Sequence, residues 1–320
     1  MINLDDKFKQ PEGFAFGSFA NADGKKIRYG HVAADGAAKG TVVMTTGYAD
    51  FIESYFETIA DWKKRGFDVY IMDWIEQGGS ERNAKQGPAE NARDLHQFRQ
   101  EIIGFKKNGP VILSTHSIGS HFGLLCLKDH PGDFDCAVMA APLVDFQMSQ
   151  RKRRMINLVL DFSRAAGLGN LKIKTGRKMV TKRIARERKK GREKSARLDG
   201  PRLHIEFNSA LRVGNPTFHQ LGMFFESTAK INGADFLQAI KIPVLMGLAG
   251  SDTVADLGAI ARSAAFIPLA RAVVLEMSSH NVWLEQDSVR ERWWESIDIF
   301  IKDFCQRPVN FAVPPPPPLI

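Results

Sequence analysis

The chain has 320 residues, 44% of them apolar, which is enough for one large globular domain or for a core domain with an insertion. No apolar run reaches the ~20 residues that a membrane span needs, and the first residues lack the apolar core of a signal peptide. The three cysteines have no metal-ligand spacing, and Cys126 and Cys136 lie in apolar segments, where we expect small buried side chains. These features predict a soluble protein in the reducing cytoplasm.

The net charge of +8 is concentrated in one segment of the chain. Residues 151–200 carry 18 Lys or Arg against four acidic residues, a local charge of +14, so the remaining 270 residues sum to −6. A basic segment on a mildly acidic body indicates an anionic partner.

Apolar runs bounded by Gly, Asp and Pro alternate with segments of helical periodicity along most of the chain. In chain order, the predicted strands are residues 14–20, 27–32, 41–45, 68–73, 111–113, 136–141, 243–249 and 272–277. The predicted helices between and after them are residues 51–65, 91–107, 118–127, 254–266 and 288–305. Such alternation predicts a mostly parallel sheet with helices on both faces.

The order of these elements fits an eight-stranded α/β-hydrolase sheet. Residues 145–235 contain no convincing strand and interrupt the alternation, which predicts an inserted helical cap. We therefore expect a hydrolase core in two parts, residues 1–144 and 236–308, on either side of that cap. Residues 309–320 are a proline-rich tail, for which a solvated chain end is the expected state.

The stretch Ser114-Thr-His-Ser-Ile-Gly119 joins the fifth predicted strand to the helix that follows it. A serine at such a join, followed two residues later by Gly119, is typical of a nucleophile elbow, in which the chain turns sharply and exposes the Ser117 hydroxyl. The backbone N–H of Ile118, at the helix start, can point at a developing oxyanion. Thr115 stands where the usual G-x-S-x-G pattern has its leading glycine.

A serine nucleophile needs a histidine base, and the base needs a carboxylate to orient it. His280 lies in the loop after the eighth predicted strand and is the last histidine in the sequence. Asp252 comes directly off the seventh predicted strand and is the predicted acid, while Asp256 and Asp145 stay open as less favoured alternatives. The order Ser117, Asp252, His280 is the order in which this fold presents a catalytic triad.

The loop Thr45-Thr-Gly-Tyr48 follows the third predicted strand, where a second oxyanion donor is expected. Gly47 lets the backbone approach a substrate closely, and the N–H of Tyr48 would act together with that of Ile118. A plain turn would explain Gly47-Tyr48 alone, so its position relative to Ser117 is what favours the oxyanion hole.

Several segments together carry a resemblance to a known family. They are Thr46-Gly-Tyr-Ala-Asp-Phe-Ile-Glu-Ser-Tyr55, Asp73-Trp-Ile-Glu-Gln-Gly-Gly-Ser-Glu-Arg82, Asn215-Pro-Thr-Phe218, Ala249-Gly-Ser-Asp-Thr-Val254 and Ser279-His-Asn-Val-Trp-Leu-Glu-Gln-Asp287. In these segments the chain resembles the α/β-hydrolases of the monoacylglycerol lipase and lysophospholipase group, which are serine aminopeptidase S33-like, and most of all bacterial lysophospholipases. The resemblance implies hydrolysis of lipid esters.

The chain departs from this family pattern in three loops. Thr46 replaces the histidine of the family's His-Gly loop, Thr115 replaces the first elbow glycine, and Ile75-Glu76 replaces an Arg-Gly pair. No departure removes a triad residue, but these loops shape the acyl pocket, so they bear on the substrate.

The predicted cap holds two basic runs. Arg151-Lys-Arg-Arg154 precedes apolar residues at helical spacing, and Lys182–Arg192 is the second run. Basic amphipathic helices are typical of membrane-surface binders, and each cation near an anionic leaflet contributes about 1 kcal/mol. A merely solvated cap surface is the alternative. Nucleic acid is a disfavoured partner because no aromatic residues for base stacking interrupt the second run.

These features predict a serine hydrolase that cleaves a carboxylic ester of a lysophospholipid or monoacylglycerol through an acyl-enzyme on Ser117, without a metal or organic cofactor. We expect it in the cytoplasm, with peripheral contact at the inner membrane surface. Two other classes stay open. One is an S33-like peptidase, an amidase or a general carboxylesterase, and the other is a non-catalytic protein that binds anionic membranes on a hydrolase scaffold.

Overall fold

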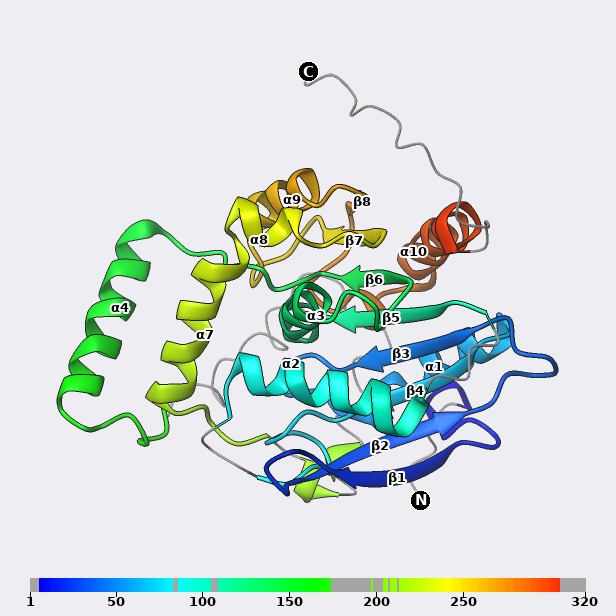
Figure 1. Ribbon diagram of the computed structural model, residues 1–320, viewed down its shortest axis with the longest axis horizontal. Helices are drawn as coiled ribbons and strands as arrows, with labels where there is room; N and C mark the ends of the chain where they lie inside the picture. The colour runs from blue at the N-terminus through cyan, green and yellow to red at the C-terminus, as the bar shows by residue number, and fades with distance from the viewer. Residues whose placement is uncertain are drawn as a thin grey trace.

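A computed structural model describes residues 6–82, 86–104, 109–173, 197, 204–206, 208–211 and 213–305 (Figure 1). Its eight strands form a single sheet in the order β1-β2-β4-β3-β5-β6-β7-β8. The strands are β1 (Ala15–Ala20), β2 (Lys26–Val32), β3 (Thr41–Thr45), β4 (Asp68–Met72), β5 (Val111–His116), β6 (Cys136–Ala140), β7 (Val244–Ala249) and β8 (Ala270–Leu275).

The sheet is mostly parallel, as the alternation of strands and helices predicted. Strand β2 pairs antiparallel with both β1 and β4, whereas the pairs from β4 through β3 to β8 are parallel. The carboxyl ends of the parallel strands therefore meet at one edge, which is where ligands bind in open α/β sheets. The predicted α/β-hydrolase fold is confirmed.

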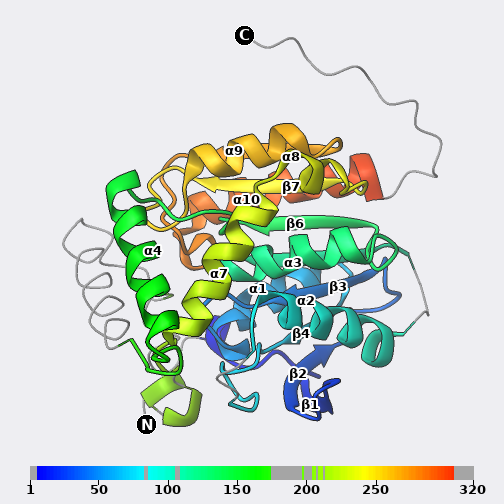
Figure 2. The ribbon, with the colours of Figure 1, turned by 60° about the vertical axis from the view of Figure 1, so that its left-hand side comes forward.

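Side chains alternate across the central strands, so each strand contributes to two cores. Val43 and Leu113 face one core and their neighbours Val42 and Ile112 face the other, and all four are fully buried. Helices cover both faces of the sheet (Figures 1 and 2). The first core includes residues of α2 (Pro88–Gln97), α3 (Ile118–Asp129) and α9 (Leu257–Phe266), and the second includes residues of α1 (Phe56–Lys64) and α10 (Asp287–Phe300).

Several helices begin or end at other residues than the periodicity-based prediction gave, or change from one helix type to another along their length. The helix expected at 51–65 begins as the 3-10 turn η2 (Ile52–Tyr55) and continues as α1. Helix α2 starts at Pro88, which suits a first helical position because proline has no N–H to leave unpaired, and it continues as the π-helix η3 (Phe98–Ile103). The last helix, α10, likewise passes into a π-helix, η6 (Ile301–Cys305).

The interruption of the alternation of strands and helices along the chain falls between β6 and β7, where a helical cap was expected. The structure describes there the helices α4 (Gln150–Ala165), η4 (Ser209–Leu211), α7 (Phe218–Ile231) and α8 (Ala234–Gln238). Helices α4 and α7 stand side by side beyond the carboxyl ends of the parallel strands (Figures 1 and 2). The limits of the cap at residues 145 and 235 stay a prediction, and the second basic run and the proline-rich tail lie outside the described residues.

Two sequence expectations concern cysteines and membrane spans. Cys126 and Cys136 are both fully buried, as expected, and Cys126 is a free thiol. Cys136, however, forms a disulfide bond. The sequence had predicted only a small buried side chain at this position. Among the described residues, no helix is both long enough and apolar enough to cross a bilayer.

Trp293 of α10 is a sensitive point of the second core, because its ring is fully buried against Gly247 of β7, where an added Cβ would lie 3.0 Å from the ring. We expect Trp293→Ala to lower the free energy of unfolding by about 3–5 kcal/mol, measured by urea denaturation. Ile299→Ala, on the exposed face of the same helix, should change it by less than about 0.5 kcal/mol. Equal losses in the two variants would contradict this packing.

Candidate active site

Ser117 lies in a strained turn between β5 and α3. Its backbone has φ 54° and ψ −119°, a conformation that residues other than glycine rarely adopt. Two hydrogen bonds to the neighbouring strand segment hold it there: the Ser117 N–H donates to the Ala140 carbonyl at 3.1 Å, and the Leu143 N–H donates to the Ser117 carbonyl at 3.0 Å. The structure thus has the elbow geometry expected from the sequence, with the serine at the carboxyl edge of the sheet.

Gly119 lies at the closest approach of α3 to the end of β3. A Cβ atom added there would lie 2.6 Å from the Thr45 hydroxyl oxygen and 2.7 Å from the Thr46 carbonyl oxygen. Both distances are shorter than any ordinary contact between carbon and oxygen atoms, so the first turn of α3 can pack this closely only with glycine. The elbow glycine predicted at this position therefore has a steric reason.

The side chain of Thr115, which replaces the leading elbow glycine, packs against residues of α3. Its hydroxyl lies 2.7 Å from the Ser120 hydroxyl. Its methyl group faces Gly123, where an added Cβ would lie 3.3 Å from it. At this contact the glycine belongs to α3 and the larger side chain to β5.

His280 and Asp252 meet Ser117 at the same edge of the sheet. His280 Nε2 lies 2.7 Å from Ser117 Oγ, and His280 Nδ1 lies 2.7 Å from Asp252 Oδ2. Since an ionised carboxylate can only accept, Nδ1 carries the hydrogen and Nε2 is left to accept the Ser117 proton. All three residues are at least 95% buried. The structure thus brings together the three residues that the sequence singled out.

Asp252 is itself held in position by the backbone that follows it. Its Oδ1 accepts hydrogen bonds from the Val254 N–H at 2.7 Å and the Ala255 N–H at 3.1 Å, which turns Oδ2 toward His280. Burial raises the pKa of Asp252, but the hydrogen bond and charge of His280 and these two N–H groups outweigh it, so the pKa lies below its usual value. The carboxylate is therefore ionised at neutral pH.

The two alternative acids are engaged elsewhere. Asp256 is the N-cap of α9, where its side chain accepts the Ala259 N–H at 2.7 Å. Asp145 pairs with Arg153 and accepts its neighbour's N–H, that of Phe146, at 2.7 Å. Neither reaches His280 through a hydrogen bond or ion pair within the described part of the chain.

The loop from Thr46 to Ala49 is fixed by side chains on both sides of Tyr48. The Gly47 N–H donates to the Tyr55 hydroxyl at 3.1 Å, and the Ala49 N–H donates to Gln77 Oε1. In the described residues, no protein acceptor takes the N–H of Tyr48, and none takes that of Ile118 at the start of α3. The oxyanion-hole role of these two N–H groups stays a prediction.

The altered loop Asp73-Trp-Ile-Glu-Gln77 also supports this segment. Trp74 Nε1 donates to the Thr46 carbonyl at 2.8 Å, and Gln77 supplies the bond to Ala49. These contacts come from positions on either side of Ile75-Glu76, so the loss of the family's Arg-Gly pair leaves them intact.

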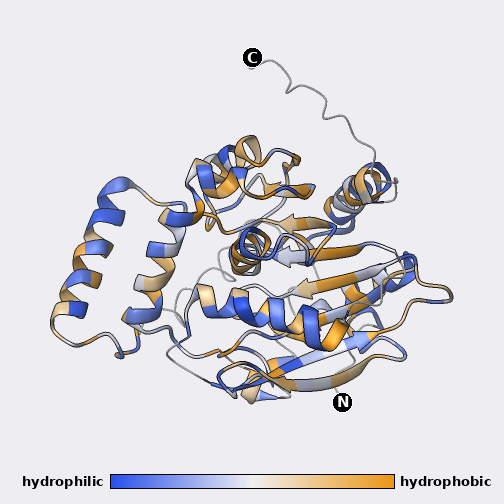
Figure 3. Cartoon of the chain, viewed as in Figure 1, coloured by the Kyte–Doolittle hydropathy of each residue, from blue (hydrophilic) through white to orange (hydrophobic). Residues whose placement is uncertain are grey.

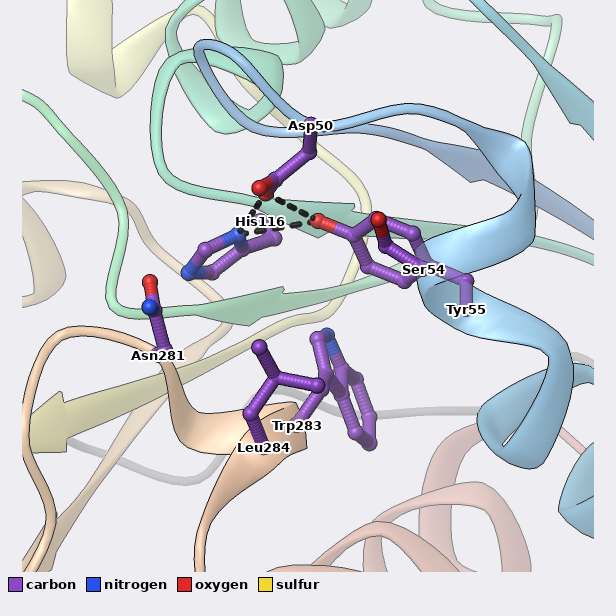
Figure 4. A pocket seen from close by; sticks show the side chains of 7 residues that line it. All are labelled: Asp50, Ser54, Tyr55, His116, Asn281, Trp283 and Leu284. Carbon is purple, nitrogen blue, oxygen red and sulfur yellow. Dashed lines mark hydrogen bonds and ion pairs between the residues drawn. The ribbon is translucent and has the colours of Figure 1, made fainter. Parts of the chain in front are cut away.

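Three residues that sequence reasoning did not assign lie directly behind His280. His116, Asp50 and Tyr55 form a hydrogen-bonded group beside the loop that carries His280 (Figure 4). Asp50 and Tyr55 stood in a segment of family resemblance, and His116 precedes the nucleophile, but none had a partner visible in the sequence. Their position at the same sheet edge as Ser117 was the one available signal.

His96, His130 and Asp133 form a group of potential metal ligands within the described ranges, with ligand atoms at most 4.8 Å apart. The group lies at the far end of α3, whose 12 residues span about 18 Å from Ser117. His96 Nδ1 already bonds Asp133 Oδ2 at 2.7 Å, and the two imidazoles stack with ring centres 3.6 Å apart and planes at 9°. Parallel rings do not aim their nitrogen lone pairs at one point, so this arrangement is a stacked hydrogen-bonded pair and plays no part at Ser117.

Comparison with known proteins fits this geometry. The family model described as "Serine aminopeptidase, S33" matches residues 36–287. The chain belongs to this family. It is a serine hydrolase of the S33 family, as the resemblance in its loop segments implied.

Two curated relatives of this S33 hydrolase carry lipid-related names. The "Probable lysophospholipase L2" of Haemophilus influenzae is 21% identical over 294 residues, which cover 86% of this chain and 88% of the relative. The monoacylglycerol lipase of Mycolicibacterium smegmatis is 27% identical over 135 residues, covering 40% of this chain and 46% of the relative.

Solved structures of low identity share the fold. A soluble variant of the monoglyceride lipase of Saccharomyces cerevisiae, in complex with a substrate analogue, superposes with a TM-score of 0.72 at 15% identity, covering 92% of this chain and 98% of that one. A thermostable carboxyl esterase of Bacillus coagulans gives a TM-score of 0.68 at 17% identity, covering 92% and 100%.

The close packing at Gly119 generates a direct test of the elbow. We expect Gly119→Ala to lower the free energy of unfolding by about 1–3 kcal/mol, because the new methyl group must displace the end of β3. The measurement is urea denaturation followed by tryptophan fluorescence. Gly132→Ala is the matched control, since an added Cβ there meets nothing within 4 Å. An unchanged Gly119→Ala protein would refute the tight contact.

Proposed function

We propose that this S33 hydrolase cleaves carboxylic esters of single-chain lipids, either lysophospholipids or monoacylglycerols, through an acyl-enzyme on Ser117. The observation that carries the proposal is the hydrogen-bonded chain from Ser117 Oγ through His280 to Asp252, in the tautomer that a general base requires. The lysophospholipase and monoacylglycerol lipase names of the curated relatives favour this substrate class.

The first half of the proposed reaction is acylation. His280 Nε2 takes the proton of the Ser117 hydroxyl as Oγ attacks the acyl carbonyl carbon. Asp252 accepts the Nδ1 hydrogen of His280, which holds the imidazole in the right tautomer and stabilises the imidazolium that forms. His280 then gives its proton to the leaving glyceryl oxygen, so that the alcohol departs as a neutral molecule.

The negative charge that develops on the carbonyl oxygen needs hydrogen-bond donors. The proposed donors are the backbone N–H groups of Tyr48 and Ile118, and each such donor contributes roughly 10²–10³-fold in kcat in serine hydrolases. Gly47 and Gly119 support these two loops, because a Cβ atom at either position would collide with neighbouring protein atoms. In the second half of the reaction, His280 activates a water molecule that attacks the acyl-enzyme and releases the fatty acid.

The proposal includes peripheral contact with an anionic membrane through α4. This helix buries only Leu160 and Ser163. Its apolar residues at helical spacing are exposed instead: Met155 59%, Leu158 70%, Val159 47% and Phe162 68%. Figure 3 shows hydrophobic and hydrophilic residues alternating along the helix.

The basic residues near the start of α4 complete this surface. Arg151, Lys152 and Arg154 are exposed, whereas Arg153 turns inward to pair with Asp145. An exposed apolar stripe beside cations is the composition of a helix that lies in the interface of an anionic bilayer. Its position beyond the carboxyl edge of the sheet would bring single-chain lipids toward Ser117. The contact is proposed for the cytoplasmic leaflet, although the disulfide at Cys136 is uncommon in reducing compartments.

The mechanism predicts that Ser117→Ala abolishes ester hydrolysis. We expect p-nitrophenyl ester turnover to fall by roughly 10⁴-fold or more, and labelling by a fluorophosphonate to disappear, because no other group can form the acyl-enzyme. Ser288→Ala, at an exposed position of α10, should retain both activities. Substantial turnover by Ser117→Ala would refute the mechanism.

A substrate panel separates the remaining classes. Lysophospholipids and monoacylglycerols should be cleaved faster than aminoacyl amides and short-chain esters. Preferred cleavage of the amides would support a peptidase or amidase, and preferred cleavage of short esters a general carboxylesterase. A wild-type protein that is neither active nor labelled would support a non-catalytic membrane-binding protein.

The membrane proposal predicts binding that depends on both α4 and anionic lipid. We expect sedimentation with phosphatidylserine-containing vesicles, and at least about tenfold weaker binding for Arg151→Gln combined with Arg154→Gln, since two cations are lost. Leu158→Ser combined with Phe162→Ser should also abolish binding. Ile299→Ser, on α10, is the exposed apolar control. Equal binding to neutral phosphatidylcholine vesicles, or no effect of the α4 substitutions, would contradict the proposal.

A further inference from the structure

Behind the predicted base lies a second histidine–aspartate pair. His116 Nδ1 lies 3.3 Å from Asp50 Oδ2 and 3.0 Å from the Tyr55 hydroxyl oxygen, and that hydroxyl lies 2.8 Å from Asp50 Oδ2. His116 and Tyr55 are 97% buried or more. Figure 4 shows the three side chains converging from the loop after β3, the end of η2 and the end of β5.

Each outer contact of this group reaches the backbone of a different catalytic loop. His116 Nε2 lies 2.9 Å from the carbonyl oxygen of His280, and since a carbonyl can only accept, Nε2 carries the hydrogen. At the other end, the Gly47 N–H donates to the Tyr55 hydroxyl oxygen at 3.1 Å. The group therefore spans from the loop that carries the base to the loop that carries the Tyr48 N–H.

We propose that His116, Asp50 and Tyr55 act as positioning residues that hold the His280 loop and the Gly47-Tyr48 loop in the relative placement that acyl transfer at Ser117 requires. This inference rests on the proposed function. None of the three residues touches the reacting atoms. Their effect reaches the reaction through the two backbone atoms that they bind.

The hydrogen-bond directions within the group are mutually consistent with a hydrogen on both nitrogens of His116, because the His280 carbonyl and the Asp50 carboxylate can each only accept. Gly47 donates to the Tyr55 oxygen, and the Tyr55 hydroxyl hydrogen goes to Asp50, because an ionised carboxylate can only accept. Burial raises the pKa of Asp50, but the bonds and charge of His116 and the bond from Tyr55 outweigh it, so that the pKa lies below its usual value and the carboxylate is ionised. A negative oxygen at the centre fixes the orientation of both donors.

The space around the group leaves no room for a substrate or for looser packing. A Cβ atom added at Gly47 would lie 2.7 Å from His116 Nδ1 and 2.6 Å from Asp50 Oδ2. The cavity beside the group, toward Asn281 and Trp283, has a volume of about 10 Å³, about the size of one water molecule. An acyl chain does not fit there, so the group serves the catalytic loops and not the substrate pocket.

A second tie secures the His280 loop from its other side. Glu285 Oε1 accepts from the Ser279 N–H at 2.6 Å and from the Ser279 hydroxyl. The loop thus keeps a fold of its own when His116 is replaced, and what changes is its placement relative to Tyr48. This separation makes a positioning effect measurable apart from unfolding.

The test uses three substitutions that each remove a defined part of the group. His116→Gln can keep a donor where Nε2 lies but loses the contact with Tyr55. His116→Asn can keep the contact made by Nδ1 but loses the hydrogen bond to the His280 carbonyl. His116→Leu removes both. We expect kcat of His116→Leu to fall roughly 10²-fold, the size of effect that an ångström of misplacement causes, with KM changed less than about twofold. His116→Gln and His116→Asn should each recover part of the loss.

Two controls separate positioning from loss of stability. His219→Leu, at an exposed histidine, should leave kcat unchanged. Phe98→Ala removes a fully buried ring of the first core that stacks on Phe19, so it should lower stability by about 3–5 kcal/mol while its folded fraction keeps the wild-type kcat. Adding Tyr55→Phe to His116→Leu should cost much less than the product of the two single losses, because the residues act as one unit. Wild-type kcat in His116→Leu, or a decrease in kcat no larger than that of Phe98→Ala, would overturn the proposal.

A measurement that needs no substrate can test this inference separately from the proposed function. Amide hydrogen exchange should accelerate at residues 47–49 and 279–281 in His116→Leu, while amides of α2 keep their wild-type rates. If the wild-type protein proves inactive on every ester and is not labelled by a fluorophosphonate, the proposed function fails, and this exchange pattern still decides whether the group positions both loops. Unchanged exchange at both loops would refute the positioning role.

Discussion

The strained backbone of Ser117 is the constraint on which the rest of the site depends. A residue with φ 54° persists only where its surroundings hold it, and here the hydrogen bonds to Ala140 and Leu143 of the adjacent chain segment do so. They exist because β5 and β6 pair in parallel and end at the same edge. The same parallel arrangement brings the segments after β3, β7 and β8 to that edge. The geometry of Ser117 is thus a property of the whole sheet.

The cap is attached to this core very unevenly. Helix α7 is bound to it by a 2.8 Å contact between His121 Nε2 and the Ser227 hydroxyl and by the bond from Asn232 to the Val144 carbonyl. Burial of His121 in this contact lowers its pKa to about 3, so the imidazole is neutral at physiological pH. Helix α4 contributes little to the core. Helix α7 therefore packs against the core, while α4 exposes its apolar side chains.

The sequence was most informative where a one-dimensional pattern reflects a local physical requirement. Apolar runs bounded by turn residues located the strands, and the order of Ser117, Asp252 and His280 identified residues that the structure brings together. Helix starts were less accurate, since Pro88 begins its helix before the apolar periodicity does. The group around His116 could not be predicted, because its contacts join residues up to 164 positions apart and a histidine before a serine has no pattern of its own.

The close contact between Thr115 and Gly123 has a consequence for finding similar proteins. What the elbow requires is a pair of contacting positions with a limited combined volume, and that condition is symmetrical in the strand and the helix. A search pattern that insists on glycine two residues before the serine rejects chains that meet the condition from the helix. In an alignment of such chains, the two positions should vary together, with a small residue at one whenever the other is large.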